Sequence, residues 1–534
     1  MSRTRLALAL AAALGSGCRA PSESSAREQP SKCLVKLEPG ELVGQDRGKA
    51  VVYRGIPYAA PPVGELRFRP PAPVPPWSGV LEATTYGPKC PQRGLGDAVI
   101  GEEDCLSLNV WRPSADPPAG EAGHPVLVFI HGGSNVMGWS ADPLHRGRTL
   151  AAEHGLVVVT FNYRLGLLGF LAHPALTRES GGSGNWAHLD QIAALQWVAD
   201  NIAKFGGDPE RVTLAGQSAG EHSVCALLGS PLAAGLFQRA ILQSGGCDLA
   251  PLELREAQGE RLMKVANCDR AEDPLACLRT RDPEALVVLT PPATPGKARG
   301  ESDWVLPVGG AVDGKVFTHD PWASFSAQQH AVVPTLVGAT ADETELFMSS
   351  SMDSCAAYEA MIRANFRTSA AAVLARYPCE DDASARRVYV EVTTDALFGC
   401  QVRRTLRALA PAAGQAGVPL FRYVYAYTRH DPAVERLRAF HGGDLQLLFG
   451  TSERLGYATP DFEQELAQTI RHSWATFAAT GSPVHEGTPG WTAWTPARDN
   501  ALRFDATIST LAPVDGERCD FWDSLEAEPP ASPK

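Results

Sequence analysis

The sequence predicts an α/β protein in which a mostly parallel central sheet is covered by helices on both faces. Short apolar runs alternate with helical stretches along the chain, as in strands joined by crossover helices. The 534 residues are 44% hydrophobic, which is enough to bury a large core. One apolar run ends at a glycine-flanked serine, Ser218, that opens a helical pattern.

The strand candidates are short runs rich in β-branched and aromatic residues. They are VLVFIH, LVVVTFNY, VTLAG, AILQSG, TLVGAT and LFRYVYAY. Ser218, Glu343 and His441 follow such runs, and in a parallel sheet reactive groups gather on loops beyond the carboxyl ends of the strands. Because residues from His131 to His441 must then converge, residues 34–525 are predicted to form one domain.

Ser218 lies in the segment RVTLAGQSAGEHSV, which predicts a strand, a sharp turn and a helix. Gly216 and Gly220 allow the strand and the helix to approach closely, and the strained turn exposes the hydroxyl. A GxSxG pattern alone is weak evidence. In this context it is typical of the nucleophile elbow of an α/β-hydrolase, with the helix from Ala219 pointing its positive end at developing negative charge.

A helix is also predicted before the elbow, in DQIAALQWVADNIAKFGG. Its apolar positions recur at near-helical spacing: Ile192, Leu195, Val198 and Ile202. Gly206 and Gly207 end the pattern. We expect a turn over 207–211 and then a strand over 212–215.

The two ends of the chain are predicted to lie outside the folded body. Residues 1–17 have the basic start, short apolar run and small residues of a secretory signal. Residues 18–33 form a polar, flexible tether, and 526–534 a polar tail. We expect an exported protein, secreted or periplasmic. The GSGC ending also resembles a bacterial lipobox, in which a lipidated Cys18 would anchor the protein to a membrane; plain secretion stays open.

Charge and spacing exclude several classes of function. The net charge of −12 argues against nucleic acid as a partner. No cluster of His, Cys or carboxylates has metal-ligand spacing and no phosphate loop is present, so we expect no metal and no cofactor. No protein partner is predicted. Twelve cysteines in an exported chain predict several disulfides.

Longer motifs resemble those of one family. Between Tyr53 and Trp522 the chain carries YRGIPYAAPPVGELRFRPP, EDCLSLNVWRP, VFIHGGSN, NYRLGLLGFL, GATADETELF, FHGGDLQLLFG and CDFWD. Their content and order resemble the type-B carboxylesterases, which include the cholinesterases and bacterial para-nitrobenzyl esterases. The resemblance implies the α/β-hydrolase fold and a serine hydrolase that cleaves carboxylic esters through an acyl-enzyme.

The resemblance also gives each candidate catalytic residue a role. Ser218 would be the nucleophile, His441 the general base, and Glu343 the acid that orients the imidazole. On spacing alone, Asp342 and Glu345 are as good as Glu343. Glu343 is preferred because it matches the family's Asp-Glu-Gly, although threonine replaces the glycine here.

Backbone donors and supporting side chains follow from the same resemblance. The amides of Gly133, Ser134 and Ala219 would bind the oxyanion. Ser244 matches a family serine that hydrogen-bonds the catalytic acid. Gln217 precedes the nucleophile, where the cholinesterases have glutamate.

Structural pairs complete what the resemblance implies. The ion pairs are Arg67 with Glu103 and Arg164 with Asp190, and the disulfides are Cys90–Cys105, Cys268–Cys277 and Cys400–Cys519. A fourth disulfide, Cys355–Cys379, is a further hypothesis. We expect Cys225, on the helix after Ser218, to be a buried thiol. Cys33 and Cys247 stay unassigned.

The substrate is expected to be a neutral or apolar ester. Binding of a quaternary ammonium requires an aromatic face and a carboxylate. The segment between Cys90 and Cys105, which holds the choline-binding tryptophan in the cholinesterases, has no aromatic residue, and Gln217 is neutral. Two alternatives stay open: a lipase acting on longer-chain esters, and a non-catalytic binding protein of the cholinesterase-like kind.

Overall fold

The computed structural model describes residues 33–526, except 95, 97, 291–307, 349–351, 453–455, 457–459, 489 and 515. The predicted signal (1–17) lies outside the described residues. So do nearly all of the tether (18–33), including Cys18, and of the tail (526–534).

The largest sheet has eleven strands in the order β18-β17-β16-β15-β12-β11-β9-β10-β8-β4-β3. In chain order they are β3 (Gln45–Asp46), β4 (Ala50–Pro57), β8 (Ser107–Pro113), β9 (His124–Ile130), β10 (Val157–Phe161), β11 (Gly207–Gln217), β12 (Arg239–Gln243), β15 (Thr335–Thr340), β16 (Leu420–Tyr425), β17 (Ala501–Phe504) and β18 (Ser509–Leu511). The strands from β10 to β17 in this order pair in parallel. Pairings of β3, β4, β8 and β18 are antiparallel.

Smaller sheets lie outside this one. They are β1 (Leu34–Lys36), β2 (Glu41–Val43) and β5 (Val80–Glu82); β6 (Gln92–Arg93) and β7 (Val99–Ile100); and β13 (Ala250–Pro251) and β14 (Ala311–Val312).

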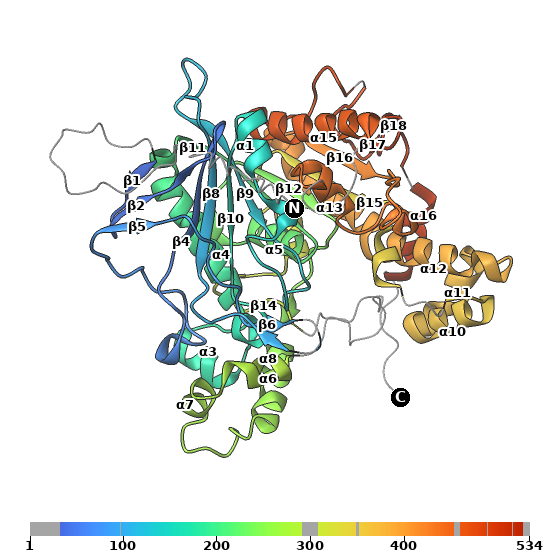
Figure 1. The fold of residues 1–534 in the computed structure, drawn as a ribbon. Coiled ribbons are helices and arrows are strands. Elements are labelled where there is room, and N and C mark those ends of the chain that lie inside the picture. Colours follow the sequence, from blue (N-terminus) through green and yellow to red (C-terminus); the bar gives the residue numbers. More distant parts are fainter. Residues whose placement is uncertain are drawn as a thin grey trace, which may run out of the picture.

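The helices connect and cover the strands (Figure 1). They are α1 (Arg148–His154), α2 (Gly166–Phe170), α3 (Pro174–Ser180), α4 (Trp186–Asn201), α5 (Ala219–Leu228), α6 (Leu252–Val265), α7 (Pro274–Arg279), α8 (Pro283–Leu289), α9 (Pro321–Ser326), α10 (Cys355–Phe366), α11 (Ala370–Arg376), α12 (Ala385–Thr394), α13 (Cys400–Ala416), α14 (Gly443–Leu448), α15 (Asp461–Thr480) and α16 (Gly516–Glu526). Among the described residues, no helix combines the length and apolarity needed to cross a membrane.

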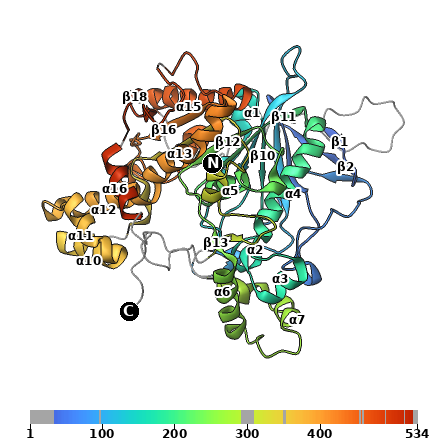
Figure 2. The same cartoon turned by 180° about the vertical axis from the view of Figure 1, so that it is seen from behind.

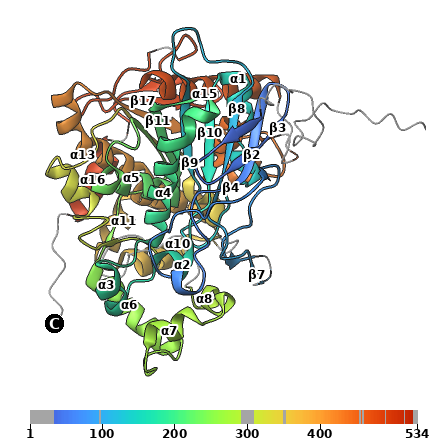
Figure 3. The ribbon, with the colours of Figure 1, turned by 90° about the vertical axis from the view of Figure 1, so that its left-hand side faces the viewer.

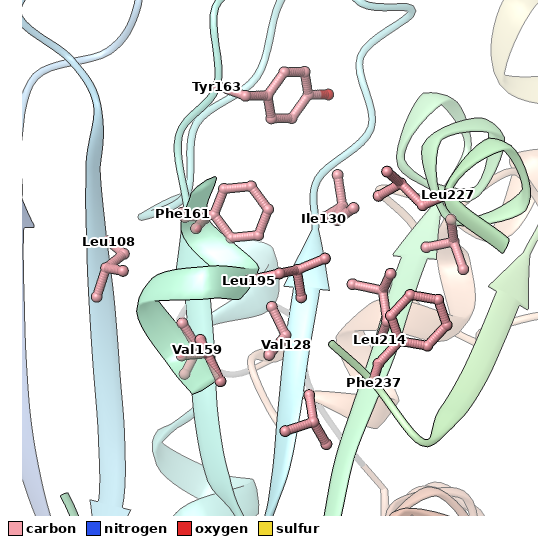
Figure 4. Close-up of a cluster of buried hydrophobic side chains, with 14 of the residues drawn as sticks. Leu108, Val128, Ile130, Val159, Phe161, Tyr163, Leu195, Leu214, Leu227 and Phe237 are labelled. Atoms are coloured by element: carbon pink, nitrogen blue, oxygen red, sulfur yellow. The ribbon is translucent and has the colours of Figure 1, made fainter. Parts of the chain in front are cut away.

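The parallel strands are buried on both faces, which explains their continuous apolar runs. Along β9, Val128 and Ile130 belong to one core with α4, α5 and α13, whereas Leu127 and Phe129 belong to another with α1, α14 and α15. Figure 4 shows part of the first core, and Figure 2 shows α4 and α5 from behind the view of Figure 1. The predicted mostly parallel sheet with helices on both faces is confirmed.

Two helical groups extend beyond these layers (Figures 1 and 3). Residues of α6, α7 and α8 share a core with α2, and residues of α10, α11 and α12 share one with α16. Both groups follow a strand of the main sheet and rejoin it later in the chain. They therefore add surface beside the sheet and leave its parallel core uninterrupted.

The local predictions around the elbow hold except at one turn. All six strand candidates coincide with strands, and the predicted helix is α4, followed by a 3₁₀ helix over Ile202–Phe205 and a left-handed Gly206. The predicted turn over 207–211 is wrong. Gly207 already pairs with His124 of β9, and a register shift absorbs the residues before Val212, so β11 begins at Gly207.

The structure forms all four disulfides that had been expected: Cys90–Cys105, Cys268–Cys277, Cys355–Cys379 and Cys400–Cys519. The expectation of a free Cys225 thiol is wrong. Because α5 packs against β12, Cys225 lies beside the segment that follows β12 and is bonded to Cys247. Cys33 is disulfide-bonded as well. Five disulfides among the described residues indicate an extracytoplasmic protein.

Candidate active site

Ser218 lies between β11 and α5 in a strained backbone conformation. Its φ of 59° and ψ of −124° are unfavourable for a residue with a side chain, and its amide is anchored to the carbonyl of Gln243 at 2.9 Å. The side chain is half-buried. The turn therefore presents the hydroxyl at the carboxyl end of the parallel sheet.

Glycines on both sides of Ser218 are required by close backbone contacts. A Cβ atom at Gly216 would lie 2.4 Å from the carbonyl group of Gly220, and one at Gly220 would lie 2.1 Å from the carbonyl oxygen of Ile130. The loop after β9 is equally close, since a Cβ at Gly132 would lie 2.9 Å from that of Ser218. These contacts bring β9, β11 and α5 together at the serine.

Glu343 and His441 meet on the loops after β15 and β16. Glu343 begins a 3₁₀ helix (Glu343–Phe347) directly after β15, and His441 precedes α14. The imidazole Nδ1 lies 2.5 Å from Oε2 of Glu343, and the other carboxylate oxygen accepts the amide of Thr340 at 2.6 Å. Both side chains are buried. Glu343 is therefore held in a position to accept a hydrogen bond from the Nδ1–H group of His441.

The two other carboxylates in this turn have different partners. Asp342 pairs with Arg438 at 3.2 Å, and Glu345 pairs with Arg386 at 2.6 Å. Sequence spacing alone could not distinguish the three acids. In the structure, Glu343 is the one of the three that contacts the imidazole. The threonine that replaces the family's glycine hydrogen-bonds inward to Thr393 and does not disturb this contact.

The second imidazole nitrogen faces a glutamine. Nε2 of His441 lies 3.0 Å from Nε2 of Gln217, the residue before the serine. Among the described residues, Ser218 forms no hydrogen bond with His441. The structure therefore places the serine, imidazole and carboxylate on neighbouring loops, with the Gln217 amide on the nitrogen that a nucleophile would use.

Unpaired backbone amides lie next to the serine. Gly133, with φ of 113°, and Ser134, with φ of 53°, shape the loop after β9, and Ala219 begins α5. Within the described part of the chain none of these three amides donates to a protein group. The first amides of a helix have no intrahelical acceptor and favour negative charge. This arrangement can bind an oxyanion.

The expectation for Ser244 is wrong in this structure. Its hydroxyl is completely buried at the end of β12 and forms no hydrogen bond with a described residue. Oε1 of Glu343 accepts a hydrogen bond from the amide of Thr340 instead. The resemblance to the family suggested a side-chain donor, Ser244. The backbone donor, the amide of Thr340, depends on the conformation of the turn after β15, which the sequence does not reveal.

Two further buried carboxyls lie around Glu343, and sequence reasoning missed both. Burial and the nearby Glu343 raise the pKa of Asp444 to about 6, and the same two causes raise that of Glu221 well above its usual range. Asp444 accepts hydrogen bonds from Gln243 and Tyr423. The sequence did offer one indication of Asp444: it lies three residues after His441, at the start of a helix.

Aromatic rings cover the imidazole. The ring centroids of Phe347 and Phe398 lie 5.1 Å and 5.2 Å from that of His441. Phe398 comes from a π-helical turn (Asp395–Gly399), a feature common at functional sites. Phe347 is 40% exposed. The base therefore borders an apolar surface that remains open to a ligand.

A charged cavity of about 590 Å³ is lined in part by Asp342, the residue before Glu343. Its arginines are balanced by an equal number of carboxylates: Arg387, Arg438, Arg503 and Arg518, with Asp342, Glu391, Asp395 and Asp505. None of Ser218, Glu343 and His441 lines it. Its polar lining does not suit an apolar acyl group, so it is not the ester site.

Residues 31–522 match the model of the family described as the carboxylesterase family. This chain belongs to the carboxylesterase family. The carboxylesterase is 34% identical over 487 residues to a para-nitrobenzyl esterase of Bacillus subtilis, covering 89% of this chain and 95% of that protein. It is 33% identical over 516 residues to carboxylesterase 1C of Rattus norvegicus, covering 90% of each.

A solved structure of a PNB esterase superposes on the carboxylesterase with a TM-score of 0.79 at 32% identity. The match covers 92% of this chain and all of that one. The predicted family and α/β fold are confirmed, and the carboxylesterase is a carboxylic ester hydrolase of the type-B family. The predicted ion pairs also form, Arg67 with Glu103 and Arg164 with Asp190.

Proposed function

We propose that the carboxylesterase cleaves neutral or apolar esters through an acyl-enzyme on Ser218. The observation that carries the proposal is the 2.5 Å hydrogen bond between His441 and Glu343 beside a strained serine. Such a pair fixes the imidazole with its proton on Nδ1 and a lone pair on Nε2. A serine hydroxyl needs that lone pair in order to react at neutral pH, so the Gln217 amide must release Nε2 when Ser218 attacks.

In the proposed reaction, the Ser218 oxygen attacks the ester carbonyl and His441 takes the hydroxyl proton. The amides of Gly133, Ser134 and Ala219 stabilise the negative oxygen that develops. Collapse of this intermediate breaks the ester bond, and the departing alcohol receives the proton from His441. Water then attacks the acyl-enzyme by the same route and releases the carboxylic acid. Glu343 stays ionised throughout and stabilises the imidazolium.

The surroundings of the base support an uncharged substrate. Phe347 and Phe398 offer apolar contact next to His441. The neutral Gln217 supplies no carboxylate for a cationic alcohol group. We therefore expect esters of simple alcohols to be hydrolysed faster than choline esters with the same acyl group, and the opposite order would contradict the substrate class.

A series of para-nitrophenyl esters of increasing acyl length tests the activity and the nucleophile together. Ser218→Ala is expected to lower kcat by at least about ten-thousand-fold. The control Ser509→Ala, at an exposed serine on the edge strand β18, should keep wild-type rates. Retained hydrolysis in Ser218→Ala would refute the proposal. A rate that rises when short-chain esters aggregate would favour the lipase alternative, and a wild type that is inactive on every ester would favour the binding protein.

We also propose that residues 1–17 direct export of the mature chain to an oxidising compartment. The disulfides among the described residues support an oxidising compartment. Mass spectrometry of the N-terminal peptide tests this proposal. A mature chain that begins near Cys18 is expected, and a lipid on Cys18 would show that the chain is also anchored to a membrane. An unmodified cysteine would leave simple secretion, and an intact residue 1 would refute export by this signal.

A further inference from the structure

A buried disulfide joins the helix after the nucleophile to the post-β12 segment (residues 244–247). Cys225 lies in α5, the helix that begins directly after Ser218, and Cys247 is the last residue of the segment. The exposed fractions of the two cysteines are 0% and 1%. Neither cysteine was assigned a partner from the sequence. The bond therefore connects two elements that the sequence analysis left separate.

The post-β12 segment lies between the elements that carry the nucleophile and the acid. Gln243, which leads into the segment, accepts the amide of Ser218 at 2.9 Å. The amide of Ser244 donates to the carbonyl of Gly338 in β15, also at 2.9 Å. Strand β15 leads directly into the turn that carries Glu343. A shift of this segment would therefore change the position of the nucleophile relative to the acid.

A buried carboxyl packs against the same segment. Glu221, in the first turn of α5, is 1% exposed. A Cβ atom at Gly245 would lie 2.6 Å from Oε2 of Glu221, so the carboxyl contacts the backbone of the segment directly. Among the described residues, that oxygen has no hydrogen-bond partner and the carboxyl has no cation beside it. Burial of such a group costs free energy, and water would relieve the cost if the segment moved away from α5.

Resting on the proposed function, we propose that the Cys225–Cys247 disulfide positions the catalytic centre. It holds the post-β12 segment against α5 in spite of the buried carboxyl. The bond lies one helical turn after Glu221 and two residues after Gly245, next to the contact that the carboxyl would open. Without the bond the segment moves away from α5, and the nucleophile and the acid lose their relative position.

Noncovalent packing keeps the protein folded when the bond is absent. Sγ of Cys247 also lies 3.6 Å from the hydroxyl of Thr405 in α13. Both cysteines belong to the hydrophobic core on that face of the sheet. We therefore expect removal of the disulfide to lower stability and displace the segment, with the domain still folded.

A second disulfide provides a matched control. Cys355 and Cys379 are 24 positions apart, in the outlying group with α10 and α11, whereas Cys225 and Cys247 are 22 apart. Loop entropy predicts nearly equal losses of stability, because it depends on the logarithm of loop length. Cys225→Ala with Cys247→Ala is expected to lower kcat on a para-nitrophenyl ester at least about fivefold, with KM unchanged. Cys355→Ala with Cys379→Ala should keep kcat within about twofold of wild type.

Glu221→Met tests the cause of the displacement, because it removes the carboxyl and keeps the length of the side chain. In this background, loss of the Cys225–Cys247 disulfide is expected to lower kcat by less than about twofold. An equal loss of kcat in both backgrounds would overturn the proposal. Wild-type kcat in Cys225→Ala with Cys247→Ala, or a change in KM alone, would overturn it as well.

All rates are measured well below the unfolding midpoint of each variant. If the alanine pair does not fold, Cys225→Val with Cys247→Ala, which fills more of the disulfide's volume, takes its place. Labelling of wild-type Ser218 with an organophosphonate separates the two proposals. A labelled wild type whose kcat does not depend on the disulfide refutes this inference alone, whereas an unlabelled wild type refutes the proposed function.

Discussion

At the scale of single residues, the site concentrates buried polar groups around one acid. Glu343 has the imidazole and a backbone amide as partners, whereas Glu221 and Asp444 lie near it without a cation that the structure pairs to them. Like charges in a desolvated pocket cannot all ionise cheaply. Asp444 and Glu221 therefore hold their protons to a higher pH than exposed carboxyls do.

The raised pKa of Asp444 predicts that the free energy of unfolding depends on pH. Burial first, and Glu343 second, raise its pKa from 3.8 to about 6 in the folded protein. The folded state thus holds a proton that the unfolded chain releases, so the contribution to stability is complete below about pH 4 and is lost as the pH rises to about 6. The loss amounts to about 3 kcal/mol.

Asp444→Asn removes the titration and keeps an acceptor for Gln243 and Tyr423. We expect the difference in apparent Tm, variant minus wild type, to grow between pH 4 and pH 6 and to stay constant above that range. Thermal scans at one heating rate measure it. The control Asp353→Asn, at an exposed carboxylate, should show no such trend. A constant difference for Asp444→Asn across this range would contradict the assignment.

At the scale of elements, much of the fold could be predicted because strand runs and the elbow are encoded locally. LFRYVYAY and TLVGAT are β16 and β15 almost to the residue. The turn before Val212 was missed because pairing with β9 extends the strand, and Cys225 was missed because its partner approaches only through the packing of α5. Contacts among side chains from separate loops, such as Gln217 with His441, leave no local signature in sequence.

The close packing at the nucleophile elbow predicts that adding one methyl group at Gly220 is costly. Gly220→Ala would place a Cβ 2.1 Å from the carbonyl oxygen of Ile130, so α5 must move away from β9 and misplace Ser218. We expect kcat/KM to fall by at least about a hundredfold, since small displacements of this kind are costly. The control Gly414→Ala, in α13 with no atom nearby, should instead stabilise the protein by about 0.5–1 kcal/mol. Equal activity of both variants would show that the close approach is unnecessary.

At the scale of the whole molecule, we propose that residues 34–525 act as one domain. The site draws on the ends of β9, β11, β15 and β16, and both helical faces of the sheet enclose it. The disulfides differ in what they join: one links the body to an outlying group, and another lies within an outlying group. Cys400–Cys519 joins α13 to α16 across 119 residues, whereas Cys268–Cys277 closes a segment of nine.

Loop length therefore predicts how much each disulfide stabilises the fold. Chain entropy gives about 5 kcal/mol for Cys400–Cys519 and about 2.5 kcal/mol for Cys268–Cys277. We expect Cys400→Ser with Cys519→Ser to lower the denaturant midpoint more than Cys268→Ser with Cys277→Ser. Urea unfolding of the two double variants measures the order, and a reversed order would show that the α13–α16 link adds little to the stability of the domain.

Active-site labelling tests the nucleophile most directly. The carboxylesterase is treated with an uncharged organophosphonate, and the modified peptide is identified by mass spectrometry. One label per chain is expected, on Ser218, with loss of esterase activity in the same proportion and no labelling after unfolding in urea. Modification at another residue, or full inactivation with Ser218 unmodified, would contradict the assignment of Ser218 as the nucleophile.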